Sequence, residues 1–269
     1  MPTAKIIPAP IKALAPFKFR PTFYYGFEFE GILNGDYCWD FKAGLLNLHP
    51  KIKFGRDSSI RNIPDNCIDI EFQTPKLGEN EAFALLEEIL CYLIPMSEEN
   101  IFQTNSSCGL HINMSERNIF KYGAQLHYYS NIIHNFDETG ILKTFGREKS
   151  TYCRDFKRTN RCKTVDSIYK RIKYLDDIRD DVEYYSRVPA NKKYYSVALR
   201  ENPSRTHEAN CRIEFRGIGN KDYHLRTKDL TDAVAHVRTV SQQAVNPILP
   251  LIQNSINAQN LVNPSLQCV

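Results

Sequence analysis

Residues 23–31 read FYYGFEFEG, and the alternation within this stretch decides the fold class. Neighbouring side chains of a β-strand point to opposite faces of the sheet, so every second residue shares a face. Phe27 and Phe29 are therefore predicted to enter the core, while Glu28 and Glu30 emerge together on the other face. The stretch predicts a half-buried strand whose polar face carries two adjacent carboxylates.

Three later segments repeat this alternation of apolar and polar residues. They read CIDIEFQ at 67–73, GLHINM at 109–114 and CRIEFR at 211–216. In each segment the apolar residues are predicted to be buried beneath a polar face. The polar residues displayed would be Asp69, Glu71, His111, Asn113, Arg212, Glu214 and Arg216.

The solvated side of a half-buried strand is the ordinary interpretation of any one of these faces. Together, however, the four faces offer five carboxylates, a histidine and two arginines. Acidic residues are depleted in strands and repel each other across a face. Mg²⁺ and Mn²⁺ prefer such oxygen ligands, with an occasional histidine, and arginine forks suit phosphate oxygens. The combined pattern predicts a metal-and-phosphate site on one face of a sheet.

Helical periodicity between these strands sets the domain organisation. Helices are predicted at 80–93, 116–135, 165–185 and 227–244, with a further strand at 194–199. Strands interspersed with helices predict an α+β fold, a mainly antiparallel sheet with flanking helices. One domain is expected over residues 21–252, between an extended arm at 1–20 and a polar tail at 253–269.

Composition excludes several classes of protein. No apolar run approaches the roughly eighteen residues of a membrane span, and the N-terminus lacks the apolar stretch of a signal peptide. The eight cysteines form no CxxC pair, so free thiols are expected and a zinc site is not. These features predict a cytoplasmic protein, in a bacterium or a phage-infected host cell.

Basic residues are concentrated between Lys143 and Lys173. This segment holds eleven lysines and arginines against three acidic residues, so it carries +8 and the rest of the chain −4. A local basic patch on an otherwise acidic molecule favours a compact anion, such as a polyphosphate, over a long nucleic acid. Arg154, Arg158 and Arg161 are predicted to contact a triphosphate or an acidic substrate; a solvated basic face is the alternative.

Five motifs, in order along the chain, resemble those of the putative amidoligase family, a relative of glutamine synthetase and the glutamate–cysteine ligases. The motifs are Gly26-Phe-Glu-Phe-Glu30; Asp57-Ser-Ser-Ile60 followed by Asp69-Ile-Glu71 and Thr74-Pro75; Cys108-Gly-Leu-His111-Ile-Asn113; Lys193-Tyr-Tyr195; and Arg212-Ile-Glu-Phe-Arg216. The resemblance implies a glutamine-synthetase-like catalytic domain, whose curved antiparallel sheet forms a funnel open to ATP and metal ions.

The resemblance also implies roles for individual residues. Arg212 and Arg216 would hold phosphate or the reacting carboxylate. Nucleotide contacts would come from Asn113 and Lys193, where the family commonly has a second histidine and an arginine. The metal ligands would be Glu28, Glu30, Glu71, His111 and Glu214.

The activity implied is an ATP-dependent carboxylate–amine ligase that uses Mg²⁺ or Mn²⁺. Transfer of the γ-phosphoryl group to a carboxylate would give an acyl phosphate, which an amine attacks to form an amide. The expected partners are small-molecule or peptide carboxylates and amines, without nucleic acid or a membrane. A homo-oligomer or a viral assembly would be a further partner.

Other functions fit parts of the same pattern. Asp57 followed by Glu71-Phe-Gln73 approximates the core of a restriction-type metal-dependent nuclease, whose basic segment would contact nucleic acid. A kinase that stops at phosphoryl transfer is a second alternative. A non-catalytic assembly protein, for example within a phage particle, is a third and would suit the arm and the tail.

Overall fold

The computed structural model describes residues 21–116, 119, 124–150, 153–177, 195–200 and 212–262. Several sequence predictions fall outside these ranges in whole or in part. The arm at 1–20 and the nucleotide contact Lys193 lie outside entirely. The predicted helices at 116–135 and 165–185, the strand at 194–199 and the tail at 253–269 are described only in part.

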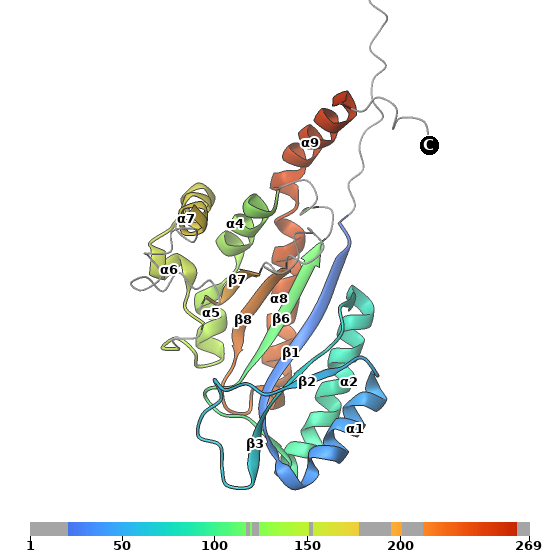
Figure 1. Ribbon diagram of the computed structural model, residues 1–269. Coiled ribbons are helices and arrows are strands. Elements are labelled where there is room, and N and C mark those ends of the chain that lie inside the picture. The colour runs from blue at the N-terminus through green and yellow to red at the C-terminus, as the bar shows by residue number, and fades with distance from the viewer. Residues whose placement is uncertain are drawn as a thin grey trace, which may run out of the picture.

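An eight-stranded antiparallel sheet forms the centre of the fold (Figure 1). Its main path runs β2-β3-β1-β6-β8-β7, and β4 and β5 pair with other parts of the long strand β1. β1 is therefore the strand around which the sheet is organised. The strands are β1 (Phe23–Asn34), β2 (Lys53–Gly55), β3 (Cys67–Gln73), β4 (Leu77–Gly78), β5 (Phe102–Gln103), β6 (Gly109–Glu116), β7 (Val197–Arg200) and β8 (Arg212–Gly219).

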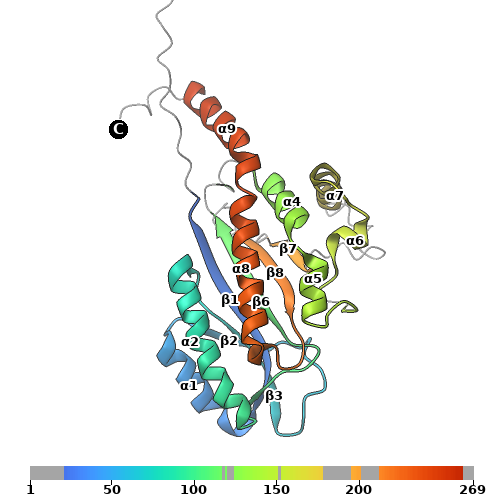
Figure 2. The same ribbon diagram turned by 180° about the vertical axis from the view of Figure 1, so that it is seen from behind.

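Helices α1, α2 and α8 cover one face of this sheet and stand in front of it in Figure 2. α4, α5, α6 and α7 gather beside β7 and β8, with α5 in contact with β8. The α-helices are α1 (Cys38–Leu48), α2 (Glu79–Glu98), α4 (Gln125–Asn135), α5 (Glu138–Thr144), α6 (Phe156–Asn160), α7 (Val165–Asp177), α8 (Thr227–Gln243) and α9 (Leu249–Val262). Short 3-10 turns are η1 (Gly35–Tyr37), η6 (Tyr223–Leu225) and η7 (Asn246–Ile248).

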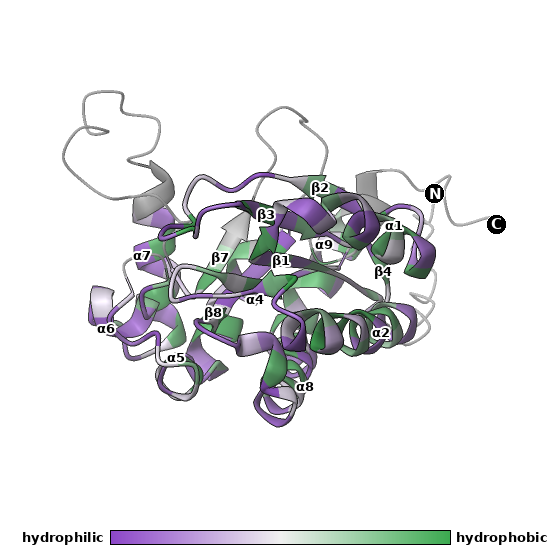
Figure 3. Ribbon diagram, turned by 90° about the horizontal axis from the view of Figure 1, so that it is seen from below, coloured by the Kyte–Doolittle hydropathy of each residue, from purple (hydrophilic) through white to green (hydrophobic). Residues whose placement is uncertain are grey.

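The core lies between the sheet and the α2–α8 layer. Phe27 and Phe29 of β1 are buried there, as the alternation predicts. The ring of Phe83, on α2, packs against Phe27 at a centroid distance of 5.8 Å. α2 and α8 are amphipathic, with apolar and polar residues interspersed along each helix in Figure 3. Because the helices take the apolar face, the polar faces of β1, β3, β6 and β8 are left on the opposite side of the sheet.

The α+β class and the antiparallel sheet are confirmed, and so is the strand at 67–73. One helix prediction is wrong at its start. Residues 115 and 116 continue β6 by pairing with β1, and α4 begins only at Gln125. Glu116 is fully buried there and accepts hydrogen bonds from the backbone N–H groups of Thr22 and Ile119, a role that helical periodicity does not reveal.

Other differences concern helices between and after the predicted elements. α1, α5 and α6 are not among the predicted helices. α5 and α6, with seven and five residues, are too short for helical periodicity to show. The eleven-residue α1 was missed although most of its residues are apolar. α9 extends to Val262, into residues assigned by sequence to the polar tail. The predicted helix at 165–185 is described only to Asp177.

Candidate metal centre

Strand pairing brings the predicted carboxylates together on the face opposite to the helices. Glu28 of β1 lies opposite His111 of β6 on one side and opposite Gln73 of β3 on the other. Glu30 lies directly opposite Glu71. Cross-strand neighbours have side chains about 5 Å apart, so like charges repel here unless a cation is shared between them.

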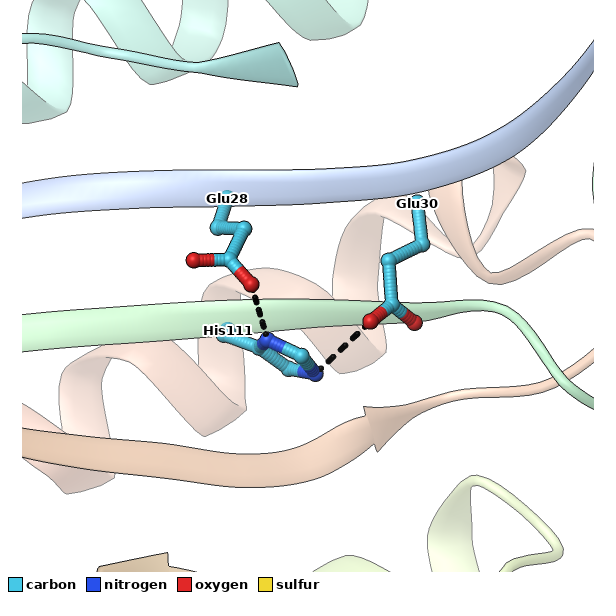
Figure 4. A group of neighbouring side chains, drawn as sticks. All are labelled: Glu28, Glu30 and His111. Carbon is cyan, nitrogen blue, oxygen red and sulfur yellow. Dashed lines mark hydrogen bonds and ion pairs between the residues drawn. The ribbon is translucent and has the colours of Figure 1, made fainter. Parts of the chain in front are cut away.

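His111 is the hub of the cluster (Figure 4). Its Nδ1 atom lies 2.9 Å from Glu28 Oε1 and 3.5 Å from Glu214 Oε1. Its Nε2 atom lies 3.4 Å from Glu30 Oε1. The ring is 1% exposed, so three carboxylates from two neighbouring strands surround a buried imidazole.

β8 contains a β-bulge next to His111. Leu110 pairs with Ile218 and Ile112 with Phe215, so β8 has one residue more than β6 between these two pairs. The extra residue lies in the Arg216–Gly217 stretch, directly across from His111. Bulges bend a strand and redirect its side chains, and they recur next to active sites. On the same strand, the Glu214 carboxylate lies beside His111 and accepts a hydrogen bond from Arg216.

A second acidic group overlaps the first. Asp57, from the loop between β2 and β3, lies with Glu30 and Glu71, and one carboxylate oxygen from each falls within 4.8 Å of the others. Glu28, Glu30 and His111 satisfy the same condition. Glu30 therefore belongs to both groups and connects them.

The acidity of these groups reflects burial and crowding. Burial raises the pKa of Glu30 to about 7, and the negative charge of nearby Asp57 also acts to raise it. The pKa of Glu71 is raised by burial and by the charge of Glu28. Burial also acts to raise the pKa of Asp57, but hydrogen bonds from the backbone and hydroxyl of Ser59, at 2.8 Å each, reverse the direction and lower it.

The pKa of His111 is the balance of opposite effects. Burial acts to lower it, because the charged imidazolium loses its hydration. The charge of Glu30 and the hydrogen bond with Glu28 outweigh burial, so the pKa of His111 is raised overall. The cluster therefore retains protons at neutral pH that a divalent cation could displace.

These residues fit a hard divalent cation. The two groups provide carboxylate oxygens and one imidazole, the donor set that Mg²⁺ and Mn²⁺ accept. Glu30 belongs to both groups, so it would be a ligand for a cation held by either one. One nitrogen of His111 would face an ion while the other stays hydrogen-bonded to a carboxylate, a common arrangement for metal-binding histidines.

The two predicted arginines on this face differ in how deeply they are buried. Arg216 is largely buried and its Nη1 donates to Glu214 Oε1, while its Nε is buried without a partner. Arg212 is exposed, and its Nε donates to Asn113 Oδ1 at 2.7 Å. Glu214 is thus held by Arg216 beside His111, outside the two three-ligand groups.

A pocket of about 240 Å³ opens next to the cluster, at the end where β1 begins. Glu28 connects it to the cluster, and Gly26, Gln73, Asn113 and Arg212 line it as well. The predicted nucleotide contact Asn113 is therefore placed at a polar opening beside the candidate metal ligands.

Arg154 and Arg158 lie elsewhere. They line a separate pocket of about 340 Å³ between α5 and α6, together with acidic Glu148 and Asp155. Within the described ranges neither arginine contacts the acidic cluster, so a role in binding the same ligand stays a prediction. Asp57, whose role the sequence left open, and Arg147, which it did not single out, do lie at the site.

A second buried glutamate, Glu138 at the start of α5, lies apart from the metal centre. Its Oε2 accepts hydrogen bonds from Ser196 Oγ and, at 2.7 Å, from the Phe156 N–H, while its Oε1 has no partner. Burial, followed by the charge of Asp155, raises the pKa of Glu138 to about 7. The carboxyl group ties α5 to the start of α6 and to the strand edge at Ser196.

We expect the Glu138→Gln variant to gain stability over the wild type as the pH rises. The pKa of Glu138 is higher in the folded state, about 7, than its ordinary 4.5, so the folded state holds the extra proton between these values. The wild type therefore loses stability across that window, by roughly 2–3 kcal/mol, and a neutral amide does not. Urea unfolding at pH 5 and pH 8 checks this; an unchanged difference between the two proteins would contradict it.

Comparisons with protein-family models, with curated proteins and with solved structures find no match to this chain. The family resemblance therefore stays a prediction based on the ordered motifs. None of the helices in the described ranges combines the length and hydrophobicity that a bilayer crossing requires.

Proposed function

We propose that this chain is an ATP-dependent, Mg²⁺- or Mn²⁺-using carboxylate–amine ligase of the amidoligase type, on a glutamine-synthetase-like domain. The observation that carries the proposal is the sharing of Glu30 by two ligand groups, Glu28/Glu30/His111 and Glu30/Asp57/Glu71. The ordered amidoligase-like motifs support it independently. A buried arginine and an adjoining polar pocket supply the other elements that phosphate chemistry needs.

A carboxylate has a poor leaving group for attack by an amine. Phosphorylation converts the carboxylate into an acyl phosphate, from which phosphate can leave. Divalent cations, when bound, neutralise phosphate oxygens during this transfer. Arg216 would stabilise charge that develops on the transferring phosphoryl group, from a position fixed by Glu214. Arg212 and Asn113 would orient the substrate at the pocket. The amine then attacks the acyl carbon, the C–N bond forms, and phosphate leaves with the C–O bonding pair. The attacking nitrogen loses one proton to the departing phosphate or to solvent.

One observation bears on the nuclease alternative. Asp57 and Glu71, its proposed metal ligands, do lie together. Gln73, where such enzymes have a lysine, donates to Glu71 Oε1 at 2.5 Å and to Glu28 Oε2 at 3.3 Å. It supplies no positive charge, and the nuclease interpretation leaves Glu28 and His111 without a role.

The test is to incubate the full chain with ATP, Mg²⁺, a pool of carboxylic acids and hydroxylamine. Hydroxylamine attacks acyl phosphates, so a ligase is expected to release ADP and phosphate and to form hydroxamates. A stable phosphorylated product without hydroxamate would indicate a kinase. Cleavage of added DNA or RNA without ATP consumption would indicate a nuclease, and no reaction with any pool would favour an assembly protein.

Metal binding should strengthen as the pH rises from 6 to 8. The pKa values of Glu30, at about 7, and of His111 are both raised, so both groups hold protons at pH 6 that a cation must displace. The apparent Mn²⁺ affinity is expected to rise about tenfold per pH unit for each proton released. Calorimetry in two buffers of different ionisation enthalpy measures that release; equal affinities at pH 6 and pH 8 would count against this site.

A further inference from the structure

Arg147 lies in the loop after α5 and is 5% exposed. Its Nη1 donates to the backbone carbonyl of Ile218 at 2.8 Å and makes a longer contact of 3.4 Å with that of Cys108. Asn220, at the end of β8, donates to the carbonyl of Phe145 at 3.0 Å and so holds the loop against the sheet. The guanidinium is thus fixed by main-chain groups across the end of β6 and β8.

Two glycines make room for this guanidinium. Gly109 of β6 and Gly219 of β8 lie directly opposite each other in the sheet. A Cβ atom on Gly219 would overlap Arg147 Nη1, and one on Gly109 would lie 2.7 Å from it. Gly219 also has a φ of +158°, which few other residues adopt. The pair therefore forms a notch that any larger residue would close.

The Glu30 carboxylate lies close to the Arg147 guanidinium but does not form a direct ion pair with it. Across the described part of the chain Arg147 forms no ion pair, and its buried Nε has no hydrogen-bond partner. A buried charge is destabilising unless it is paired, so buried arginines normally form an ion pair with a carboxylate. Glu30 is also a candidate metal ligand, so a bound cation would neutralise it and leave the guanidinium able to attract an anion that arrives with a ligand.

The notch also borders the metal centre. The point at which a Gly109 Cβ would stand is 3.2 Å from Glu30 Oε2 and 3.2 Å from His111 Nε2. Arg147 Nη1 is 2.7 Å from the same point. A basic group and two candidate metal ligands therefore meet around Gly109, where a Cβ atom would be in tight contact with all three.

We infer that Arg147 is an anion-binding residue at the closed end of the metal centre, where it contacts an oxygen of a phosphate or carboxylate group. Once cations neutralise Glu30, that oxygen would find the guanidinium on one side and the metal ligands on the other. This inference rests on the proposed function for the metal centre. It does not require ATP to be the source of the phosphate.

The probes are inorganic phosphate and acetate, titrated by calorimetry into the full chain with saturating Mg²⁺. Tighter binding of phosphate would assign a phosphoryl group to this position, and tighter binding of acetate a substrate carboxylate. We expect Arg147→Met to weaken the preferred anion at least tenfold. Mn²⁺ affinity measured without either anion should stay equal or increase, because a positive charge beside the cations has been removed. A purely structural role would weaken cation and anion binding together.

Gly109→Ala tests the same inference with every charge retained. Its methyl group would occupy the volume between Arg147 and the candidate metal ligands, so anion binding should again fall. Gly55→Ala is the matched control, because a Cβ at Gly55 in β2 meets nothing within 4 Å. Thermal unfolding shows whether each variant is folded. Wild-type anion affinity in folded Arg147→Met or in Gly109→Ala, or no anion binding by the wild type, would overturn the inference.

The outcomes also separate this inference from the ligase proposal. Arginine-dependent phosphate binding without ATP consumption would leave Arg147 assigned and remove the ligase activity. ATP-dependent ligation with unchanged anion binding in both variants would support the ligase activity and remove the assignment of Arg147.

Discussion

Replacing Glu30 with glutamine is expected to abolish divalent-cation binding and, with it, ATP turnover. Glu30 is the only residue shared by the two candidate ligand groups found in the described chain, so its loss disrupts both. An amide keeps the size and the hydrogen-bonding capacity of the side chain but supplies no negative charge. Mn²⁺ binding followed by electron paramagnetic resonance should fall by at least 100-fold, about 3 kcal/mol in binding free energy.

The matched control for this prediction is Glu138→Gln. Glu138 is also a buried glutamate with a pKa of about 7, but it lies among α5, α6 and Ser196, away from the acidic cluster. This variant should bind Mn²⁺ like the wild type. Equal Mn²⁺ affinity in Glu30→Gln and the wild type would mean that the cluster is not a metal site.

The same Glu30→Gln change should stabilise the protein in the absence of metal. Glu30 is 4% exposed and crowded by Asp57 and Glu71, so its ionisation above pH 7 opposes folding. Removing that charge should raise the free energy of unfolding by about 1–3 kcal/mol at pH 8. A gain in stability with a loss of function is typical of catalytic residues held in unfavourable surroundings.

Replacing Arg216 with lysine is expected to have the second-largest effect. Arg216 holds Glu214 through Nη1 and keeps a buried, unpartnered Nε on the same rigid fork. A lysine ammonium is a single charged point and cannot hold Glu214 and contact a phosphoryl group in fixed geometry. We expect kcat to fall roughly 100-fold with a smaller change in KM, since the lost contact belongs to the transition state.

Arg238→Lys provides the matched control. Arg238 on α8 also contacts a glutamate through its fork, Glu79 of α2, but on the helical side of the sheet. That ion pair is partly exposed, so its replacement should cost at most about 1 kcal/mol of stability and leave turnover unchanged. If Arg216→Lys behaved like Arg238→Lys, Arg216 would have no part in the reaction.

Period-two alternation was sufficient to predict which strand residues share a face. Glu28, Glu30, Glu71 and His111 were placed on one face because the apolar residues between them had to be buried, and the sheet bears this out. Alternation gives neither strand order nor register. That Glu30 lies opposite Glu71, and Glu28 opposite His111, depends on how separate segments pair.

Two residues at the site that strand alternation does not indicate depend on irregular backbone. Asp57 reaches the cluster from a loop shaped by its own hydrogen bonds to Ser59, and no periodicity marks such a position. The Arg147 guanidinium packs against Gly109 and Gly219. These glycines are 110 positions apart in the sequence and become neighbours only through strand pairing. The bulge beside His111 has the same origin, because an extra residue in β8 is visible only against its partner strand.

The central claim, that Glu30 bridges two divalent cations beside bound nucleotide, is tested most directly by a crystal structure soaked with Mn²⁺ and a non-hydrolysable ATP analogue. Anomalous scattering at the manganese edge would locate the ions. We predict two peaks in contact with the Glu30 carboxylate, one also contacting Glu28 or His111 and the other Asp57 or Glu71. The phosphates should lie on the Arg216 side. Absence of manganese from both groups, or nucleotide bound away from this face, would contradict the account.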